Sequence, residues 1–285
     1  MLVAGVDAGS NTVKIVLIEG GSILANWISK TGPNSMKAVE KGLETILSEH
    51  GRALHDVHSI VATGYGRNYI PFATYQATEI LCQAKAIRKL IPEAKTIIDI
   101  GGQDSKVIYA DQNGRVVEFA MNDKCAAGTG RFIETLANAL HTPLEDMGAL
   151  SLKAEGEVQV SSTCTVFAES EVISYIAQGL PKPDIISGVH HAIASRVSAM
   201  ARRREICKDV CLTGGVAKNV GVVWWMEKEL GLSLRVPKEP QITAAIGAAL
   251  IGLEKASPGS HDVPFADARA PEITSFARGR EKPKG

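Results

Sequence analysis

The chain has 285 residues, and its 31 basic and 31 acidic residues leave no formal net charge. This length is sufficient for one large or two medium domains, and the balanced charge gives no overall field that would attract nucleic acid or anionic lipid. The five cysteines are an odd number without a C-x-x-C pair, which argues against a secreted disulfide scaffold and favours reduced thiols or metal ligands. Because there is no signal-peptide pattern and the apolar run at 242–253 is too short for a bilayer, we predict a cytoplasmic protein.

A strand–turn–strand unit opens the chain and recurs 92 positions later. Residues 2–6 and 13–18 are predicted strands around a polar turn, and residues 96–111 repeat the construction. The matched positions are Asp7 with Asp99, Gly9 with Gly101, Ser10 with Gly102, Asn11 with Gln103, Thr12 with Asp104, and Lys14 with Lys106. Two such hairpins facing each other can hold a polyphosphate, since small residues expose backbone amides and carboxylates hold magnesium or orient water.

Two cysteines precede predicted helices. Cys125 lies before the small-residue turn 126–130, and a helix with Phe132, Leu136 and Leu140 on one face follows. Cys164 stands 39 positions later, at the head of a helix whose stripe is Val166, Ser170, Ile173 and Ala177, with N-cap candidates at 161–163. Thiols at the positive ends of helices suit a negatively charged thiolate-ligated centre, whereas a single cysteine there is more often buried core.

The remaining segments alternate between helix and strand patterns. Helices are predicted at 34–50, 78–91, 185–204 and 240–253, and strands at 59–63 and 209–213. A glycine pair in the segment 213–219, between a strand and a helix, can let a nucleoside lie against the backbone. His190 and His191 are interpreted as ordinary helix residues, Cys82 and Cys211 as buried structural thiols, and Arg202–Arg204 as a solvated helix face. From Ser257 the composition predicts a disordered tail.

These motifs together carry a family resemblance. DAGSNTVK, DIGGQDSK and TGGVAKN resemble the phosphate-1, phosphate-2 and adenosine motifs of the acetate and sugar kinase, heat-shock chaperone and actin superfamily. Within it, TGYGRN, NDKCAAGTGRFIE and SSTCTVFAESEVIS resemble the ATP-dependent activators of 2-hydroxyacyl-CoA dehydratases, which are related to the ATPase subunits of benzoyl-CoA reductase. The resemblance extends over residues 3–253.

The resemblance implies a duplicated ribonuclease H-like, actin-like ATPase of the α/β class, with two lobes and the nucleotide in the cleft between them. The expected lobes are 1–95, with the phosphate-1 hairpin, and 96–256, with the phosphate-2 hairpin, the cysteines and the adenosine motif; 257–285 is the tail. It also implies a homodimer that shares one [4Fe-4S] cluster. A four-iron cluster needs four thiolates and one chain offers two well-placed ones, so the two expectations agree.

The resemblance also assigns roles to residues. Asp7, Gln103 and Asp104 are the expected catalytic residues, and Cys125 and Cys164 the cluster ligands. The expected contacts to ATP and Mg²⁺ are Gly9, Ser10, Asn11, Thr12, Lys14, Gly101, Gly102, Gly128, Thr129, Gly214, Gly215, Lys218 and Asn219.

The implied activity is ATP-gated transfer of a low-potential electron to an iron–sulfur 2-hydroxyacyl-CoA dehydratase, with ferredoxin or flavodoxin as donor. Nucleotide binding and hydrolysis would change the angle between the subunits. The alternatives are a related acceptor, either a double-cubane iron–sulfur protein or a benzoyl-CoA reductase-type partner, and a small-molecule kinase on the same fold.

Overall fold

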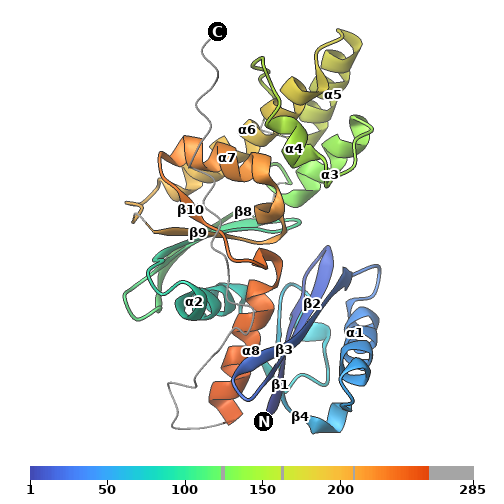
Figure 1. Ribbon diagram of the computed structural model, residues 1–285, viewed down its shortest axis with the longest axis vertical. Helices are drawn as coiled ribbons and strands as arrows, with labels where there is room; N and C mark the ends of the chain where they lie inside the picture. Colours follow the sequence, from blue (N-terminus) through green and yellow to red (C-terminus); the bar gives the residue numbers. More distant parts are fainter. Residues whose placement is uncertain (123–125, 162–163, 208, 257–285) are drawn as a thin grey trace. The chain divides into compact units, whose positions relative to one another are not determined.

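The computed structural model describes residues 1–122, 126–161, 164–207 and 209–256 (Figure 1). Contacts between residues divide the chain into two compact units. Unit 1 contains Met1–Ala94, Tyr109–Glu118 and the described residues from Pro237 onward, and unit 2 contains Lys95–Ile108 and Phe119–Val236. The first break falls after Ala94, whereas the segment 237–256, expected in the second lobe, lies in unit 1.

The described strands and helices alternate along most of the chain. The strands are β1 Leu2–Ala8, β2 Thr12–Glu19, β3 Ser22–Lys30, β4 Val57–Thr63, β5 Tyr75–Gln76, β6 Thr96–Ile100, β7 Ser105–Ala110, β8 Val116–Asn122, β9 Val210–Thr213 and β10 Leu234–Arg235. The α-helices are α1 Ser35–Glu49, α2 Glu79–Leu90, α3 Gly130–Ala139, α4 Met147–Ser151, α5 Thr165–Ala177, α6 Lys182–Ala201, α7 Val220–Leu230 and α8 Thr243–Ala256. A short 3-10 helix, η3, covers Gly215–Lys218.

Two five-stranded sheets share one topology. The first has the order β3-β2-β1-β4-β5, and the second, read from the opposite edge, has the order β8-β7-β6-β9-β10. In the first sheet β1 pairs antiparallel with β2 and parallel with β4, and in the second β6 pairs parallel with β9. Each strand of one sheet therefore has a counterpart in the other. This arrangement confirms the predicted duplicated, ribonuclease H-like fold class.

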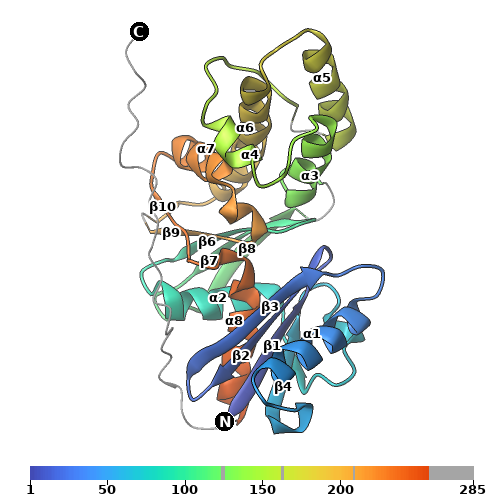
Figure 2. The same ribbon diagram turned by 45° about the vertical axis from the view of Figure 1, so that its right-hand side comes forward.

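The core of unit 1 follows the alternation of side chains along β1. Leu2, Ala4 and Val6 pack with α1 on one face of the sheet, and Val3 packs with α8 on the other. Figures 1 and 2 show α1 and α8 on opposite sides of this sheet. Because β1 is covered on both faces, it is an unbroken buried run. Gly5 faces α8, where a Cβ would overlap the backbone of Ala245, so only glycine permits this close approach.

Helices α6 and α7 form the centre of unit 2. Most of α6 is buried, including Ile185, Val189 and Ile193, and the helix packs against α7 and α4. Figure 2 shows α3 and α5 beside α6. Among the described residues, none of the helices combines the length and the apolar character needed to span a membrane.

Several predicted boundaries need correction. Helix α6 begins at Lys182 and ends at Ala201, so Arg202–Arg204 follow the helix and are exposed beyond its end. Helix α8 begins at Thr243 because Pro240–Ile242 form a 3-10 turn first. The strands β3 and β8, the short strands β5 and β10 and the short helix α4 were absent from the sequence interpretation.

The apolar stripe predicted on α5 does not face the core. Val166 and Ile173 are 66% and 55% exposed, and the buried residues of the helix are Ala168 and Val172. A spacing of four residues identifies one face of a helix but does not tell which face packs inward. Phe167 is also exposed, so α5 presents large apolar side chains to solvent.

Candidate functional site

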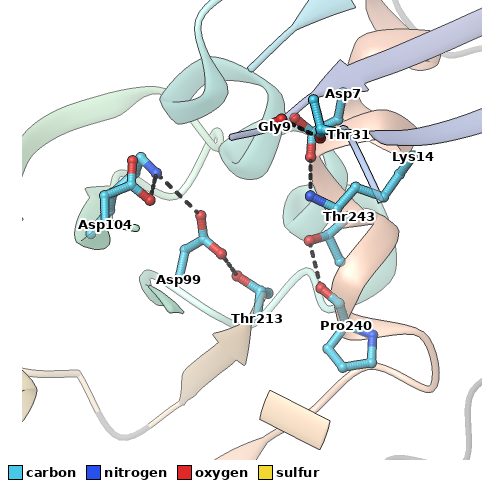
Figure 3. A network of polar contacts seen from close by, with 10 residues as sticks. Asp7, Gly9, Lys14, Thr31, Asp99, Asp104, Thr213, Pro240 and Thr243 are labelled. Atoms are coloured by element: carbon cyan, nitrogen blue, oxygen red, sulfur yellow. Dashed lines mark hydrogen bonds and ion pairs between the residues drawn. The ribbon is translucent and has the colours of Figure 1, made fainter. Parts of the chain in front are cut away.

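The phosphate-1 hairpin of unit 1 is the turn between β1 and β2. Asp7 and Lys14 are cross-strand partners, and the Lys14 Nζ lies 2.9 Å from the Asp7 Oδ2 (Figure 3). The Asp7 Oδ1 is buried and has no hydrogen-bond partner among the described residues. The Thr31 hydroxyl donates to the Gly9 carbonyl oxygen at 2.7 Å and so fixes the turn. Ser10, at the tip, is exposed and accessible to a ligand.

The phosphate-2 hairpin of unit 2 repeats this arrangement between β6 and β7. The Lys106 Nζ lies 2.8 Å from the Asp104 Oδ1 and 3.8 Å from the Asp99 Oδ2. Lys106 is only 2% exposed, so its charge is compensated within the unit by these two carboxylates. Asp104 is partly exposed and Gln103 is exposed, which leaves both able to reach a ligand or a water molecule.

One further pair of matched residues, Thr63 and Thr213, was missed in the sequence. Asp7 is in register with Thr63 on β4, and Asp99 is in register with Thr213 on β9. The Thr213 hydroxyl lies 3.3 Å from the Asp99 Oδ1, as Figure 3 shows. The duplication therefore includes a Thr-Gly step after the fourth strand of each sheet. Its two copies are 150 positions apart and have only two residue types in common, so only the shared topology makes the match visible.

The glycine of each Thr-Gly step is required by the backbone. Gly64 and Gly214 both have φ of +86°, in the left-handed region that favours glycine. A Cβ would lie 2.5 Å from the Asp7 Oδ1 at Gly64 and 2.7 Å from the Asp99 Oδ1 at Gly214. Each glycine thus lets the backbone pass close to a carboxylate of the neighbouring hairpin, an approach that any side chain would prevent.

The phosphate-2 turn is bonded directly to the start of α3. The backbone N–H groups of Gly130 and Arg131 donate to the carbonyl oxygens of Gly101 and Gly102, each at 2.8 Å. Thr129 is the N-cap residue but makes no side-chain cap, because its hydroxyl donates instead to the Ala126 carbonyl at 2.6 Å. Gly128 and Thr129, predicted as the link between cysteine loop and nucleotide, thus shape the loop, while the next two residues contact the turn.

Only one of the two predicted cluster cysteines can be described. Cys125 lies outside the described residues. Cys164 is half-buried and is itself the N-cap residue of α5, without a side-chain hydrogen bond to the first turn. The predicted N-cap candidates were Ser161 and the two residues after it; Ser161 lies before the cap, and the other two are outside the described residues. A thiol in this position lies at the start of a helix, where the backbone amides of the first turn have no partner within the helix.

The other cysteines have different surroundings. Cys82 and Cys211 are buried, and burial raises the pKa of Cys82 to about 12 and that of Cys211 still further. Both therefore stay protonated at neutral pH, which agrees with the predicted structural role. Cys207 is exposed. It provides a matched control for Cys164.

The adenosine segment runs from Gly214 through η3 to Asn219. The Asn219 Oδ1 accepts hydrogen bonds from the backbone N–H groups of Gly221 and Val222 and so caps α7. The Asn219 Nδ2 lies 3.1 Å from the Nε2 of His190, a residue that the sequence interpretation placed outside the site. The contact spans 29 positions and has no local sequence signal.

Burial lowers the pKa of His190 to about 3, and this predicts a pH-dependent stability. An unfolded histidine titrates near 6.5, so below that pH the unfolded chain binds a proton that the folded chain does not. The free energy of unfolding should therefore fall as pH falls from about 6.5 towards 3. Between pH 7.5 and 5.5 we expect His190 to add about 1 kcal/mol to this loss. Urea unfolding of the unchanged protein and of His190→Gln at both pH values checks this, and parallel losses would contradict it.

The fold and the two hairpins define a class of protein, the duplicated actin-like ATPases. A family model described as the BadF/BadG/BcrA/BcrD ATPase family matches residues 4–252. This chain belongs to that ATPase family.

Three relatives illustrate the similarity. The chain is 46% identical over 257 residues to the activator of lactoyl-CoA dehydratase from Anaerotignum propionicum, covering 90% of this chain and 99% of that protein. It is 30% identical to one of the benzoyl-CoA reductase subunits from Thauera aromatica, covering 88% of this chain and 93% of that protein. The solved structure of the activator of 2-hydroxyisocaproyl-CoA dehydratase from Clostridium difficile with bound ADPNP superposes with a TM-score of 0.86 at 42% identity, covering 90% of this chain and 96% of that one.

Proposed function

We propose that this chain is the ATP-dependent activator of a 2-hydroxyacyl-CoA dehydratase, and that it delivers a low-potential electron to that iron–sulfur enzyme. Support comes from near-complete coverage of activators at 46% and 42% identity, against 30% for the benzoyl-CoA reductase relative. We also propose that the active form is a homodimer, with ferredoxin or flavodoxin as its electron donor.

The observation that carries the proposal is the pair of backbone hydrogen bonds between the phosphate-2 turn and α3. An activator must connect events at the γ-phosphate with the place where the electron leaves. The amides of Gly130 and Arg131 are bonded to the turn that carries Gln103 and Asp104, and α3 directly follows the segment that contains Cys125. A shift of the turn is therefore transmitted to α3 without any intervening side chain, in keeping with how small displacements move packed elements.

We propose the following roles for the hairpin residues. Asp7, with one buried oxygen unpaired, would hold Mg²⁺ through water, while Lys14 neutralises the other oxygen and faces phosphate. Asp104 and Gln103 are exposed enough to orient the attacking water, and Asp104 would accept its proton. Gly9, Ser10, Asn11 and Thr12 of the first turn, and Gly101 and Gly102 of the second, would offer amides and hydroxyls to phosphate oxygens. Gly214, Gly215, Lys218 and Asn219 would border the nucleoside.

The residues at the head of α5 fit a thiolate-ligated cluster. Cys164 is half-buried, makes no capping hydrogen bond, and lies where helix amides favour negative charge on a ligand. With Cys125 it would contribute two thiolates per chain, and a partner chain would complete the four. When bound, a [4Fe-4S] cluster supplies a single electron. The exposed side chains of Val166 and Phe167, in the first turn of α5, would keep water away from that end of the helix.

Anaerobic purification followed by iron, acid-labile sulfide and mass measurements tests the proposal. We expect a dimer with about four iron atoms, whose reduced form passes electrons to a purified 2-hydroxyacyl-CoA dehydratase only while ATP is hydrolysed. A protein that stays free of iron after reconstitution and phosphorylates a sugar or a carboxylate would contradict it. A dimer that loads iron but reduces only a benzoyl-CoA reductase would change the acceptor and leave the ATPase assignment in place.

Replacing Gly130 with alanine should uncouple hydrolysis from electron transfer. A Cβ at Gly130 would lie 3.2 Å from the Gly101 oxygen and 3.4 Å from the Gly102 Cα, which is tighter than normal contact. We therefore expect the turn and α3 to separate by a few tenths of an ångström. The number of ATP molecules hydrolysed per electron delivered should rise about twofold or more. Simultaneous phosphate-release and acceptor-reduction assays measure this ratio. Asn138→Ala, on the exposed face of α3, should keep the ratio of the unchanged protein.

A further inference from the structure

The contact between α6 and the start of α7 assigns a role to a residue outside the predicted site. We infer that His190 is a positioning residue for the nucleoside: a neutral imidazole, protonated on Nδ1, that holds the side chain of Asn219 in its capping orientation. The inference rests on the proposed nucleotide binding and deepens it. It concerns how the adenosine segment keeps its shape.

The orientation of the Asn219 amide is determined by its own helix. Its Oδ1 lies 3.0 Å and 3.1 Å from the backbone nitrogens of Gly221 and Val222, and both of these groups can only donate. The amide nitrogen must therefore be the atom that faces the His190 Nε2 at 3.1 Å. Because an amide nitrogen only donates, the Nε2 must accept. The ring proton is consequently on Nδ1, which is buried and has no hydrogen-bond partner among the described residues.

The surroundings of His190 keep the ring in place and neutral. The residue is fully buried, in line with a ring that carries no charge. Gly221 gives the ring its space, since a Cβ there would lie 2.5 Å from the His190 Nδ1 and 2.9 Å from the Ser151 Cβ. The imidazole is thus enclosed by α4, by its own helix α6 and by the first turn of α7. A protonated ring would direct an N–H group against the Asn219 N–H group and break the contact.

This arrangement changes the role expected of Asn219. Its oxygen is used by two backbone groups and its nitrogen by His190, so the side chain acts mainly within the protein. Asn219 then affects the nucleoside by fixing the backbone of 214–219 and the start of α7, while the glycines of that segment approach the ligand. Loss of the His190 acceptor would free the Asn219 amide and weaken the N-cap of α7. The backbone on which we place the base and ribose would then be less well ordered.

Calorimetric titration with ADP and with tripolyphosphate, both in the presence of Mg²⁺, separates this role from a general loss of structure, which would weaken the binding of both ligands. We expect His190→Leu to weaken ADP binding about tenfold, since a buried amide loses its acceptor. Its affinity for tripolyphosphate should stay within about twofold of that of the unchanged protein, because the phosphate contacts lie elsewhere. The glutamine of His190→Gln can present its Oε1 near the position of the histidine Nε2, so the ADP affinity of this variant should stay within about threefold of that of the unchanged protein. His191→Leu is the matched control; that ring stacks on Trp225 and bonds Glu229, and its loss should change neither ligand.

Each other result has a distinct meaning. Equal affinity of His190→Leu and the unchanged protein for ADP, or equal losses for both ligands, would overturn the positioning role. Absence of ADP binding by the unchanged protein would overturn the proposed function and the inference with it.

The tautomer can be tested in the unchanged protein, so the inference does not depend on variants that fold. Nitrogen NMR of protein labelled at histidine, with His190→Gln for assignment, should show one ring with a protonated Nδ1 and an unprotonated Nε2 from pH 7.5 down to pH 5. A proton on Nε2 at neutral pH, or titration of this ring near pH 6.5, would contradict the contact with Asn219.

Discussion

Replacing Cys164 with serine is expected to lower the iron content of the anaerobically purified protein from the proposed value of about four atoms per dimer to near zero. Serine is not ionised at neutral pH and cannot act as a thiolate, and Cys164 is the described cysteine at the start of a long helix. Iron and sulfide analysis and the visible absorption spectrum measure the loss. Binding of ADP should persist, because the residues proposed to bind the nucleotide lie on other elements.

Two controls make this result specific. Cys207→Ser changes an exposed thiol and should retain the iron of the unchanged protein. Cys211→Ala removes a buried, protonated thiol and should affect stability without affecting iron. Normal iron in Cys164→Ser would exclude this residue as a ligand. Loss of iron from Cys207→Ser instead would identify Cys207 as a ligand and place the cluster at another part of the chain.

Replacing Asp104 with asparagine is expected to reduce ATP hydrolysis about 10²-fold or more while ATP binding changes little. The carboxylate can accept a proton from the attacking water, whereas an amide cannot. Asparagine keeps an oxygen for Lys106, whose Nζ is 2.8 Å from the Asp104 Oδ1, so buried charge is less disturbed than in Asp104→Ala. Single-turnover phosphate release and equilibrium nucleotide binding separate the two effects.

A carboxylate just after the other end of β7 supplies the control. Asp111 lies in the β7–β8 turn and accepts backbone hydrogen bonds from Asn113 and Arg115, which lower its pKa. Asp111→Asn preserves that geometry and should leave hydrolysis unchanged. If Asp104→Asn hydrolyses ATP at the normal rate, another group must serve as the base. Gln103→Ala would then be the next variant to measure.

The sequence predicted those parts of the fold that depend on neighbouring residues. Asp7 and Lys14, and their repeats Asp99 and Lys106, are seven positions apart, so the duplicated hairpins were recognised in the sequence, although the ion pairs within them were not predicted. The start of α5 at Cys164 followed from local patterns as well. The edge strands β3 and β8 were missed because their half-exposed residues lack a run of apolar positions.

Other features depend on tertiary structure and leave no local signal. The bonds from Gly130 and Arg131 to Gly101 and Gly102 use only backbone atoms, which every residue possesses. The contact of His190 with Asn219 joins two helices, and a buried histidine is usually a packing residue. Helix α8 was assigned to the second lobe from its place in the chain, yet its apolar face packs on β1 and β2.

The return of α8 to the first sheet also determines the order in which the protein can fold during synthesis. Val3, Val16 and Ile18 are covered by Ile246, Ala249 and Leu250, which the ribosome adds more than 200 residues later. Until then this face of the first sheet lacks α8 and is covered only in part by α2, through Cys82 and Ala86, while residues 119–236 of unit 2 have already been synthesised. Unit 2 can therefore consolidate first, and the nascent first sheet is the region that chaperones must protect from aggregation.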